Sequence, residues 1–385
     1  MKIVADQDIP FVREAFGPLG QVRTAPGRQI SPELVRDADV LLVRSVTRVG
    51  PDLLANSRVS FVATATIGTD HLDKPFLRQR GIAWADAAGC NANSVAEYVV
   101  AALLHLADRR GFSLRGKSLG VIGVGNIGSR VVRYAAALGM NVLQNDPPLQ
   151  RRTGQAHFVP LQQILQADII TLHVPLTRHG PDATWHMVDA GFLARMKPDA
   201  YLINTSRGQV VVGRDLRDAL RQRRIAGAVL DVWPGEPQID PDLLQQVQIG
   251  TAHIAGYSLD GKVNGTRMIY QALCRHFGLQ PTWDPQPLMP PPPLPRLELR
   301  AAGRQPEQII RAAVKRVYDI EADDAALRGI CRLQPEQRGD YFDRLRRDYP
   351  IRREFANTNL ILINGDAKVS ETLRALGFSV TMAQP

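Results

Sequence analysis

The chain has 385 residues, of which 44% are hydrophobic, 22% charged and 6% aromatic. This composition is typical of a globular protein and excludes a disordered or fibrous chain, and the length predicts two or three domains. Lys and Arg outnumber Asp and Glu by 47 to 38, a formal net charge of +9. The arginines are spread along the chain, which indicates a solvated surface, so we expect no nucleic-acid partner.

Cysteine usage and hydropathy indicate the cellular compartment of the protein. Cys90, Cys274 and Cys331 lie too far apart for a paired zinc or disulfide pattern, so we expect no metal. The first residues include Asp6 and Asp8 and lack the apolar core of a signal peptide. No apolar run approaches the about 18 residues that span a bilayer. We therefore expect a cytoplasmic protein without a membrane partner.

The first part of the chain alternates between two kinds of segment. From Lys2 to Asp86, short β-rich runs alternate with segments that have helical spacing or helix start signals. This alternation predicts a small parallel α/β unit. A long amphipathic helix is predicted next, from Ser94 to Arg109, with Ser94 and Glu97 in the spacing of a capping box.

A glycine-rich turn follows this helix. GVGNIG places Gly123, Gly125 and Gly128 in the spacing G-x-G-x-x-G, directly after an apolar strand and before a helical segment. In that context glycines allow a tight turn, close approach of the backbone to a pyrophosphate and close packing of helix on strand. The N-terminus of the helix then offers its N–H groups to the phosphates. The motif predicts a dinucleotide site.

The end of the next strand indicates which dinucleotide is bound. Asp146 stands where a carboxylate accepts hydrogen bonds from the adenosine ribose and repels a 2′-phosphate, which predicts NAD. Asp146 could instead cap the turn at Pro147 and Pro148. Arg151 and Arg152 are near enough to leave NADP open.

The rest of the chain continues the α/β pattern and then changes character. Strands are predicted in ADIITLHV, AYLINTS, IAGAVLDV and QIGTAHI, with helices between them, so the whole predicts a doubly wound sheet. Residues 284–296 are rich in proline and predict an extended linker. Beyond it, Pro306 to Tyr349 has a helical pattern, and the last residues indicate strand, helix, strand.

Three segments after the predicted strands carry side chains suited to hydride transfer. Arg207, Glu236 and His253 each follow the carboxyl end of a strand, the edge where open α/β sheets bind ligands. Oxidation of an alcohol needs a base for the hydroxyl proton and a cation that holds a carboxylate and polarises the C2 oxygen. Each residue alone also fits a structural role, as a helix-start cation, a turn carboxylate or a core histidine.

Together these motifs, in this order after the glycine turn, resemble the D-isomer-specific 2-hydroxyacid dehydrogenases over residues 1–280. The resemblance implies that Arg207 binds the substrate carboxylate and carbonyl oxygen, that His253 exchanges the hydroxyl proton, and that Glu236 orients His253 and favours its protonated form. It implies NAD as cofactor, with Asp231 near the nicotinamide. The implied cofactor-binding residues are Gly123, Gly125, Asn126, Ile127, Gly128, Asp146, Val174, Pro175, Thr205, Ser206, Asp231 and Gly256. At Val174 many relatives are expected to have Thr, so no hydroxyl contact is expected there.

Further segments indicate the substrate. Arg44 and Ser45 in LLVRSVTRV, Thr66 in VATATIGTDHLD and Tyr257 in HIAGYSLDGKVNGT resemble the erythronate-4-phosphate dehydrogenases, and so does the tail. This resemblance spans essentially the whole chain and implies that these four residues bind substrate. It implies NAD-dependent oxidation of 4-phospho-D-erythronate to 3-hydroxy-2-oxo-4-phosphobutanoate in pyridoxal 5′-phosphate biosynthesis. Arg44 could instead be a surface cation.

The resemblance also implies a division into domains. Residues 1–93, completed by 257–283, are expected to form a smaller flavodoxin-like α/β substrate (lid) domain. A doubly wound Rossmann NAD domain, 94–256, is inserted in it. After the linker at 284–296, residues 297–385 are expected to form an α+β dimerisation domain, so a homodimer is implied.

Two other functions share these motifs. A D-3-phosphoglycerate dehydrogenase or a glyoxylate/hydroxypyruvate reductase uses the same catalytic residues, but the helical tail disfavours both. An NAD-sensing binding protein similar to transcriptional corepressors is an alternative of another class. The absence of long disordered flanks disfavours it.

Overall fold

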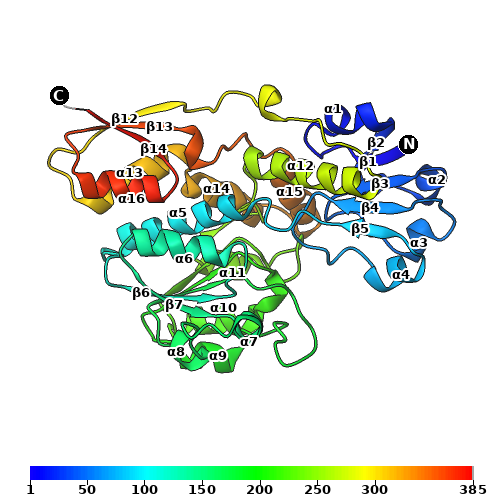
Figure 1. Cartoon of the computed structure of the whole chain (residues 1–385). Coiled ribbons are helices and arrows are strands. Elements are labelled where there is room, and N and C mark those ends of the chain that lie inside the picture. Colours follow the sequence, from blue (N-terminus) through cyan, green and yellow to red (C-terminus); the bar gives the residue numbers. More distant parts are fainter. Residues whose placement is uncertain (384–385) are drawn as a thin grey trace. The chain divides into compact units, whose positions relative to one another are not determined.

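The computed structural model describes residues 1–383, which form two compact units (Figure 1). Unit 1 consists of Met1–Asn91 and Ser258–Pro291. Unit 2 consists of Ala92–Tyr257 and the residues from Pro292 onward. Both are built on parallel sheets, as the alternation of strands and helices predicts.

Unit 1 contains one sheet of five parallel strands in the order β2-β1-β3-β4-β5. The strands are β1 Lys2–Asp6, β2 Gln21–Ala25, β3 Val40–Val43, β4 Phe61–Thr64 and β5 Ala83–Ala85. Every residue of β3 and β4 is buried, because helices cover both faces. One face packs against α1 Val12–Phe16 and α12 Leu259–His276, and the other against α2 Pro32–Val35, α3 Pro51–Leu54 and α4 Lys74–Gln79. Short 3₁₀ helices are η1 Gly17–Leu19, η2 Gly27–Gln29 and η4 Gln286–Leu288.

The larger sheet of unit 2 has six parallel strands in the order β11-β10-β9-β8-β6-β7, the doubly wound topology that the sequence predicts. Its strands are β6 Ser118–Ile122, β7 Asn141–Asn145, β8 Ile169–Leu172, β9 Tyr201–Asn204, β10 Gly227–Leu230 and β11 Ile249–Gly250. The helices of this part are α5 Ala92–Arg110, α6 Gly128–Ala137, α7 Pro147–Thr153, α8 Leu161–Ile164, α9 Ala190–Arg195, α10 Gly213–Arg221 and α11 Pro241–Gln246, with η3 Gly208–Val210. Figure 1 shows α5 and α6 on one face and α8, α9 and α10 on the other.

The tail adds a second, three-stranded parallel sheet to unit 2, in the order β12-β13-β14. Its elements are β12 Arg296–Arg300, α13 Pro306–Val317, α14 Ile320–Arg328, η5 Gly329–Arg332, α15 Pro335–Arg347, η6 Phe355–Asn357, β13 Asn359–Ile363, α16 Ala367–Ala375 and β14 Ser379–Ala383. The predicted order of helices followed by strand, helix, strand is confirmed. Strand β12 was not predicted, although its burial alternates along R-L-E-L-R as expected for a strand with one covered face.

The predicted capping box at the start of α5 is wrong. The helix begins at Ala92, two residues before Ser94. The Ser94 hydroxyl donates to Glu354 Oε1 at 2.7 Å, and Glu97 Oε1 accepts from the Phe355 N–H at 2.8 Å. Both side chains therefore bind the tail of the chain, a long-range contact that the spacing of Ser94 and Glu97 cannot reveal.

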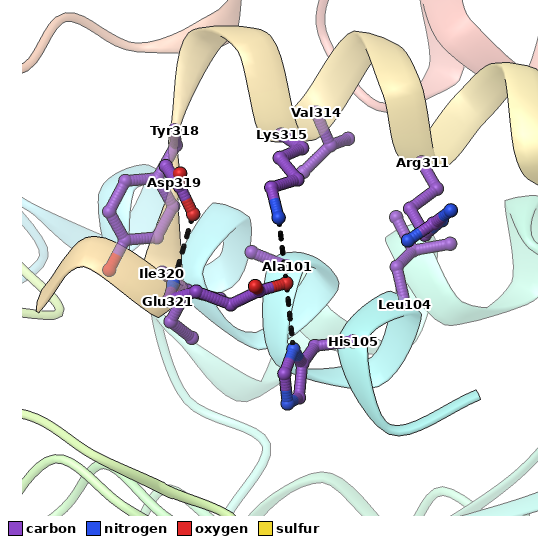
Figure 2. A pocket seen from close by; sticks show the side chains of 10 residues that line it. All are labelled: Ala101, Leu104, His105, Arg311, Val314, Lys315, Tyr318, Asp319, Ile320 and Glu321. Carbon is purple, nitrogen blue, oxygen red and sulfur yellow. Dashed lines mark hydrogen bonds and ion pairs between the residues drawn. The ribbon is translucent and has the colours of Figure 1, made fainter. Parts of the chain in front are cut away.

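The tail packs directly on α5. Figure 2 shows a pocket at this seam, where Glu321 lies between Lys315 of α13 and His105 of α5. Lys315 Nζ is 2.9 Å from Glu321 Oε1, and His105 Nδ1 is 3.2 Å from the same oxygen. The Lys315 hydrogen bond, opposed by burial and assisted by His105, lowers the pKa of Glu321. The tail and the doubly wound sheet thus share one compact unit, and the division into three domains stays a prediction.

No helix among the described residues combines the length and the apolar character needed to cross a bilayer.

Candidate active site

The three glycines of the motif have different surroundings in unit 2. Gly123 follows β6 with φ 85°, and a Cβ there would lie 2.6 Å from the His173 carbonyl oxygen. A Cβ on Gly128, at the start of α6, would collide with the Gly123 carbonyl oxygen. Around Gly125 the space is open. These are the features a dinucleotide loop needs: a tight turn, close helix packing, and a position where a pyrophosphate can approach the backbone. Helix α6 begins at Gly128 directly after this loop, and the positive end of its dipole completes a site that fits NAD.

Asp146 has the capping role that the sequence left open. Its Oδ1 accepts from the Leu149 N–H at 2.9 Å, at the start of α7. Its Oδ2 accepts from the Val124 N–H at 2.8 Å and so holds the glycine loop. Each carboxylate oxygen has a second acceptor site, so a ribose hydroxyl can still bind. Arg151, considered for a 2′-phosphate, pairs with Asp182 instead.

A buried histidine, which we did not predict, lies next to the cofactor loop. His173 precedes the predicted cofactor residues Val174 and Pro175, and its ring nitrogens lie 3.0 Å from Thr171 Oγ1 and 3.1 Å from Thr205 Oγ1. Burial lowers the pKa of His173 to about 3, so the ring is neutral at physiological pH. Its neutral ring links the ends of β8 and β9 without adding charge.

The segment that carries Arg207 is fixed by a buried amide, Asn204, which we also did not predict. Asn204 Oδ1 accepts from the Ser206 N–H at 3.0 Å and from the Ser206 hydroxyl at 2.7 Å. Asn204 Nδ2 donates to the Arg207 carbonyl at 3.1 Å. The Arg207 guanidinium donates to the Ser206 carbonyl at 2.9 Å, and its side chain is half-buried. The cation is therefore held at the carboxyl end of β9.

Asp231 anchors the segment that carries His253. It is buried after β10 and accepts from the Thr251 hydroxyl at 2.7 Å, the Ile254 N–H at 2.7 Å and the Ala255 N–H at 3.0 Å. Burial raises the pKa of Asp231 above its ordinary value, against the opposing effects of His253 and these hydrogen bonds. The carboxyl thus fixes the backbone on the C-terminal side of His253.

His253 and Glu236 form a hydrogen-bonded pair. His253 Nδ1 lies 2.8 Å from Glu236 Oε2, while Glu236 Oε1 accepts from the Trp233 N–H at 2.7 Å. Burial raises the pKa of Glu236, but the charge and hydrogen bond of His253 and the Trp233 bond outweigh it, so the pKa lies below its ordinary value. An ionised Glu236 orients the ring with Nδ1–H toward the carboxylate. His253 Nε2 is then the nitrogen that can take a proton.

The backbone at His253 is also unusual. Its φ of 56° lies in the left-handed region, which costs a non-glycine residue about 1 kcal/mol or more. The conformation is held by the His253 N–H, which donates to the Asp231 carbonyl at 2.8 Å. Strain of this kind is typical of functional sites.

Three of the predicted substrate residues lie in unit 1. Arg44 and Ser45 follow β3, and Thr66 follows the neighbouring strand β4, so all three lie at the same edge of the sheet. Arg44 is 3.6 Å from Asp6 Oδ2 and 3.7 Å from Asp8 Oδ2. Burial raises the pKa of Asp6, which the charge of Arg44 opposes.

Tyr257, the fourth predicted substrate residue, lies in unit 2, four residues after His253 and directly after Gly256. Its ring meets Tyr349 edge-on, with 5.9 Å between centroids. Arg346 Cζ lies 5.7 Å from the Tyr257 centroid. We did not predict Arg346, because a contact between residues so far apart in sequence leaves no local pattern. The substrate and cofactor roles of all these residues stay predictions.

Comparison with known proteins identifies the class to which the chain belongs. Residues 93–255 match the family of the D-isomer specific 2-hydroxyacid dehydrogenase, NAD binding domain, and residues 288–377 match a domain of unknown function. A D-lactate dehydrogenase from Aquifex aeolicus, solved with NAD and lactic acid, is 26% identical with a TM-score of 0.60, over 72% of this chain and 96% of its own. An NAD-dependent formate dehydrogenase from Staphylococcus aureus shares the fold, with 24% identity and a TM-score of 0.61, over 74% of this chain and 98% of its own. The chain is thus an NAD-dependent dehydrogenase of the 2-hydroxyacid class.

Curated relatives identify the family within this class. An erythronate-4-phosphate dehydrogenase from Marinobacter nauticus is 45% identical over 99% of this chain and 100% of its own. Another, from Salinibacter ruber, is 49% identical over 92% of each chain. The chain belongs to the erythronate-4-phosphate dehydrogenase family.

Proposed function

We propose that this protein oxidises 4-phospho-D-erythronate at C2 to 3-hydroxy-2-oxo-4-phosphobutanoate with NAD, as a step of pyridoxal 5′-phosphate biosynthesis. The observation that carries the chemistry is the 2.8 Å contact between His253 Nδ1 and Glu236 Oε2, at the sheet edge that also holds Arg207 and the glycine loop. The choice of substrate is supported by curated relatives of that name, which match the chain with its tail.

The residues of unit 2 account for each part of the reaction. NAD, when bound, supplies the acceptor for the hydride that leaves C2. His253 Nε2 takes the hydroxyl proton, and the ionised Glu236 stabilises the resulting imidazolium. Arg207 binds the carboxylate and polarises the C2 oxygen. The product then has a carbonyl at C2, and one proton has passed to the protein.

The relatives disfavour the alternatives of a phosphoglycerate dehydrogenase, a glyoxylate or hydroxypyruvate reductase, and a corepressor-like binding protein. We keep Arg44, Ser45, Thr66 and Tyr257 as proposed substrate ligands. The charge of Arg44 is partly offset by Asp6 and Asp8, so Arg44 is less suited to be the main phosphate ligand.

We also propose that the enzyme is a cytoplasmic homodimer, joined through residues 297–385, without a nucleic-acid or membrane partner. The full-length protein is expected to sediment at twice the 42.5 kDa mass of the chain. A monomer at micromolar concentration would contradict this assembly.

Transfer of deuterium tests the proposed reaction. With 4-phospho-D-erythronate deuterated at C2, the label is expected in the reduced nicotinamide, as measured by mass spectrometry of the NADH. The proposal fails if no NADH forms, or if the NADH is unlabelled while the label stays in the organic product.

A further inference from the structure

Helix α15 of the tail packs against the loop that carries Glu236. A Cβ on Gly339 would lie 2.6 Å from Gln238 Nε2 and 3.5 Å from Pro237 Cγ, so α15 approaches this loop closely. Phe342, one turn later, is completely buried. Arg346 lies seven residues after Gly339, which is two helical turns, and so shares this face of the helix.

The Arg346 side chain lies at the predicted active-site residues. Its guanidinium Cζ lies 5.7 Å from the centroid of the Tyr257 ring, and Glu236 is close enough for the two charges to interact. The side chain is 17% exposed, so a ligand can reach it. Its Nε is buried and has no hydrogen-bond acceptor among the described residues. The guanidinium is therefore incompletely satisfied.

The carboxylates near Arg346 interact with its charge but make no close contact with it. The hydrogen bonds of Glu236 go to His253 and the Trp233 N–H, and none joins Glu236 to Arg346 among the described residues. Asp343 Oδ1 lies 3.9 Å from Arg346 Nη1, beyond hydrogen-bond distance. A largely buried cation normally has a closely paired anion. This position therefore suits an anionic group supplied by a ligand.

The tail that carries Arg346 is also what distinguishes this chain from general members of its class. The D-lactate dehydrogenase of known structure matches 72% of this chain with 96% of its own length. About a quarter of this chain therefore has no counterpart there. Full-length matches come from the curated relatives, which contain the tail.

We propose that Arg346 binds the phosphate group of the substrate, so that helix α15 sets the preference for a phosphorylated hydroxy acid. The proposal rests on the proposed function. Guanidinium suits this role because its planar donors match phosphate oxygens, and hydrogen bonds between charged groups are about twice as strong as neutral ones. This role is distinct from the assembly of the homodimer that we propose for the tail.

The test compares kcat/KM for 4-phospho-D-erythronate and for D-erythronate in the wild type, Arg346→Gln and Arg346→Lys. Arg347→Gln is the matched control, since Arg347 is the next residue of α15, is 62% exposed and pairs with Asp348. Arg346→Gln is expected to lose about 30-fold or more on the phosphorylated substrate while D-erythronate stays within about 3-fold. Arg346→Lys should recover part of the loss, and Arg347→Gln should match the wild type.

Other outcomes overturn the proposal. An equal loss on both substrates, with a displaced pH profile, would make Arg346 a positioning residue for Glu236. If Arg346→Gln loses no kcat/KM on either substrate, Arg346 has only a structural role. Thermal unfolding and NAD titration of each variant identify a folding defect. If Arg346→Gln fails to fold, Arg346→Lys is the deciding variant. If Arg346 binds the phosphate, Arg346→Lys must lose kcat/KM on 4-phospho-D-erythronate but not on D-erythronate.

Inorganic phosphate separates this inference from the proposed function. It should protect the wild type and Arg347→Gln against thermal unfolding in the presence of NAD, and should protect Arg346→Gln less. If the wild type does not oxidise 4-phospho-D-erythronate, the proposed function fails, but this phosphate difference still tests Arg346. If the wild type does oxidise it and the phosphate protection is the same in Arg346→Gln, only the inference fails.

Discussion

At the scale of single residues, His253 and Glu236 are the pair that we propose for the proton transfer. Glu236→Gln keeps the shape of the side chain but removes the charge that stabilises imidazolium. Oxidation needs the neutral ring as base, so the pH at which activity rises is expected to move downward, and turnover to fall about 100-fold. The pH dependence of kcat checks this, with NAD binding as the control that should not change. An unshifted profile would show that Glu236 does not act on His253.

The positions of the proposed catalytic residues could be predicted because each follows a strand of the same parallel sheet. Parallel strands bring their carboxyl ends to one edge of the sheet. Arg207, Glu236 and His253 each follow such a strand, so they are expected at that edge. Asn204 and Arg346 could not be predicted in this way. Asn204 acts through hydrogen bonds to the backbone and side chain of nearby residues, and Arg346 reaches Tyr257 across 89 residues of sequence.

At the scale of elements, the tail is bound to α5 by a buried cation. Arg352 donates to the Ala255 carbonyl at 3.1 Å and to the Ser94 carbonyl at 2.8 Å, and lies 3.8 Å from Glu97 Oε2. Its side chain is 4% exposed and that of Glu97 is fully buried. Arg352 therefore connects the start of α5 with the segment that follows His253.

Arg352→Met is expected to lower the free energy of unfolding by about 3–5 kcal/mol, because the buried Glu97 carboxylate would lose the nearby positive charge of Arg352. The double variant with Glu97→Gln should recover part of this loss. Urea unfolding at neutral pH measures both, and Arg347→Met is the surface control, expected within about 0.5 kcal/mol of the wild type. A loss below about 1 kcal/mol in Arg352→Met would show that the pair does not hold the tail.

Secondary structure was predicted well where the hydrophobic pattern is local. The strands of the large sheet and the final strand, helix, strand follow from apolar runs between turns. Strand β12 was missed because it directly follows a run of prolines and has only two apolar residues. The start of α5 was misplaced because Ser94 and Glu97 serve long-range contacts with Glu354 and Phe355.

At the scale of the whole molecule, the tail belongs to the same compact unit as the nucleotide-binding sheet. The α14 carboxylate Asp324 accepts from the Gly250 N–H of edge strand β11 at 2.7 Å, and Arg328 donates to the carbonyls of Leu244 and Val247. Covering an edge strand protects its unpaired backbone groups. This contact could not be predicted from the sequence, because the proline-rich segment separates the α/β pattern of the sheet from the helical pattern of the tail.

The molecule as a whole is proposed to oxidise a phosphorylated D-2-hydroxy acid with NAD. The most direct measurement is the kcat/KM of the wild-type protein with NAD for 4-phospho-D-erythronate, D-erythronate, D-3-phosphoglycerate and D-lactate. We expect 4-phospho-D-erythronate to exceed each of the others by roughly 100-fold or more, since sites built to bind a polar group reject analogues that leave its partners unpaired. Equal efficiency with D-erythronate, or a higher value with D-3-phosphoglycerate, would contradict the assignment.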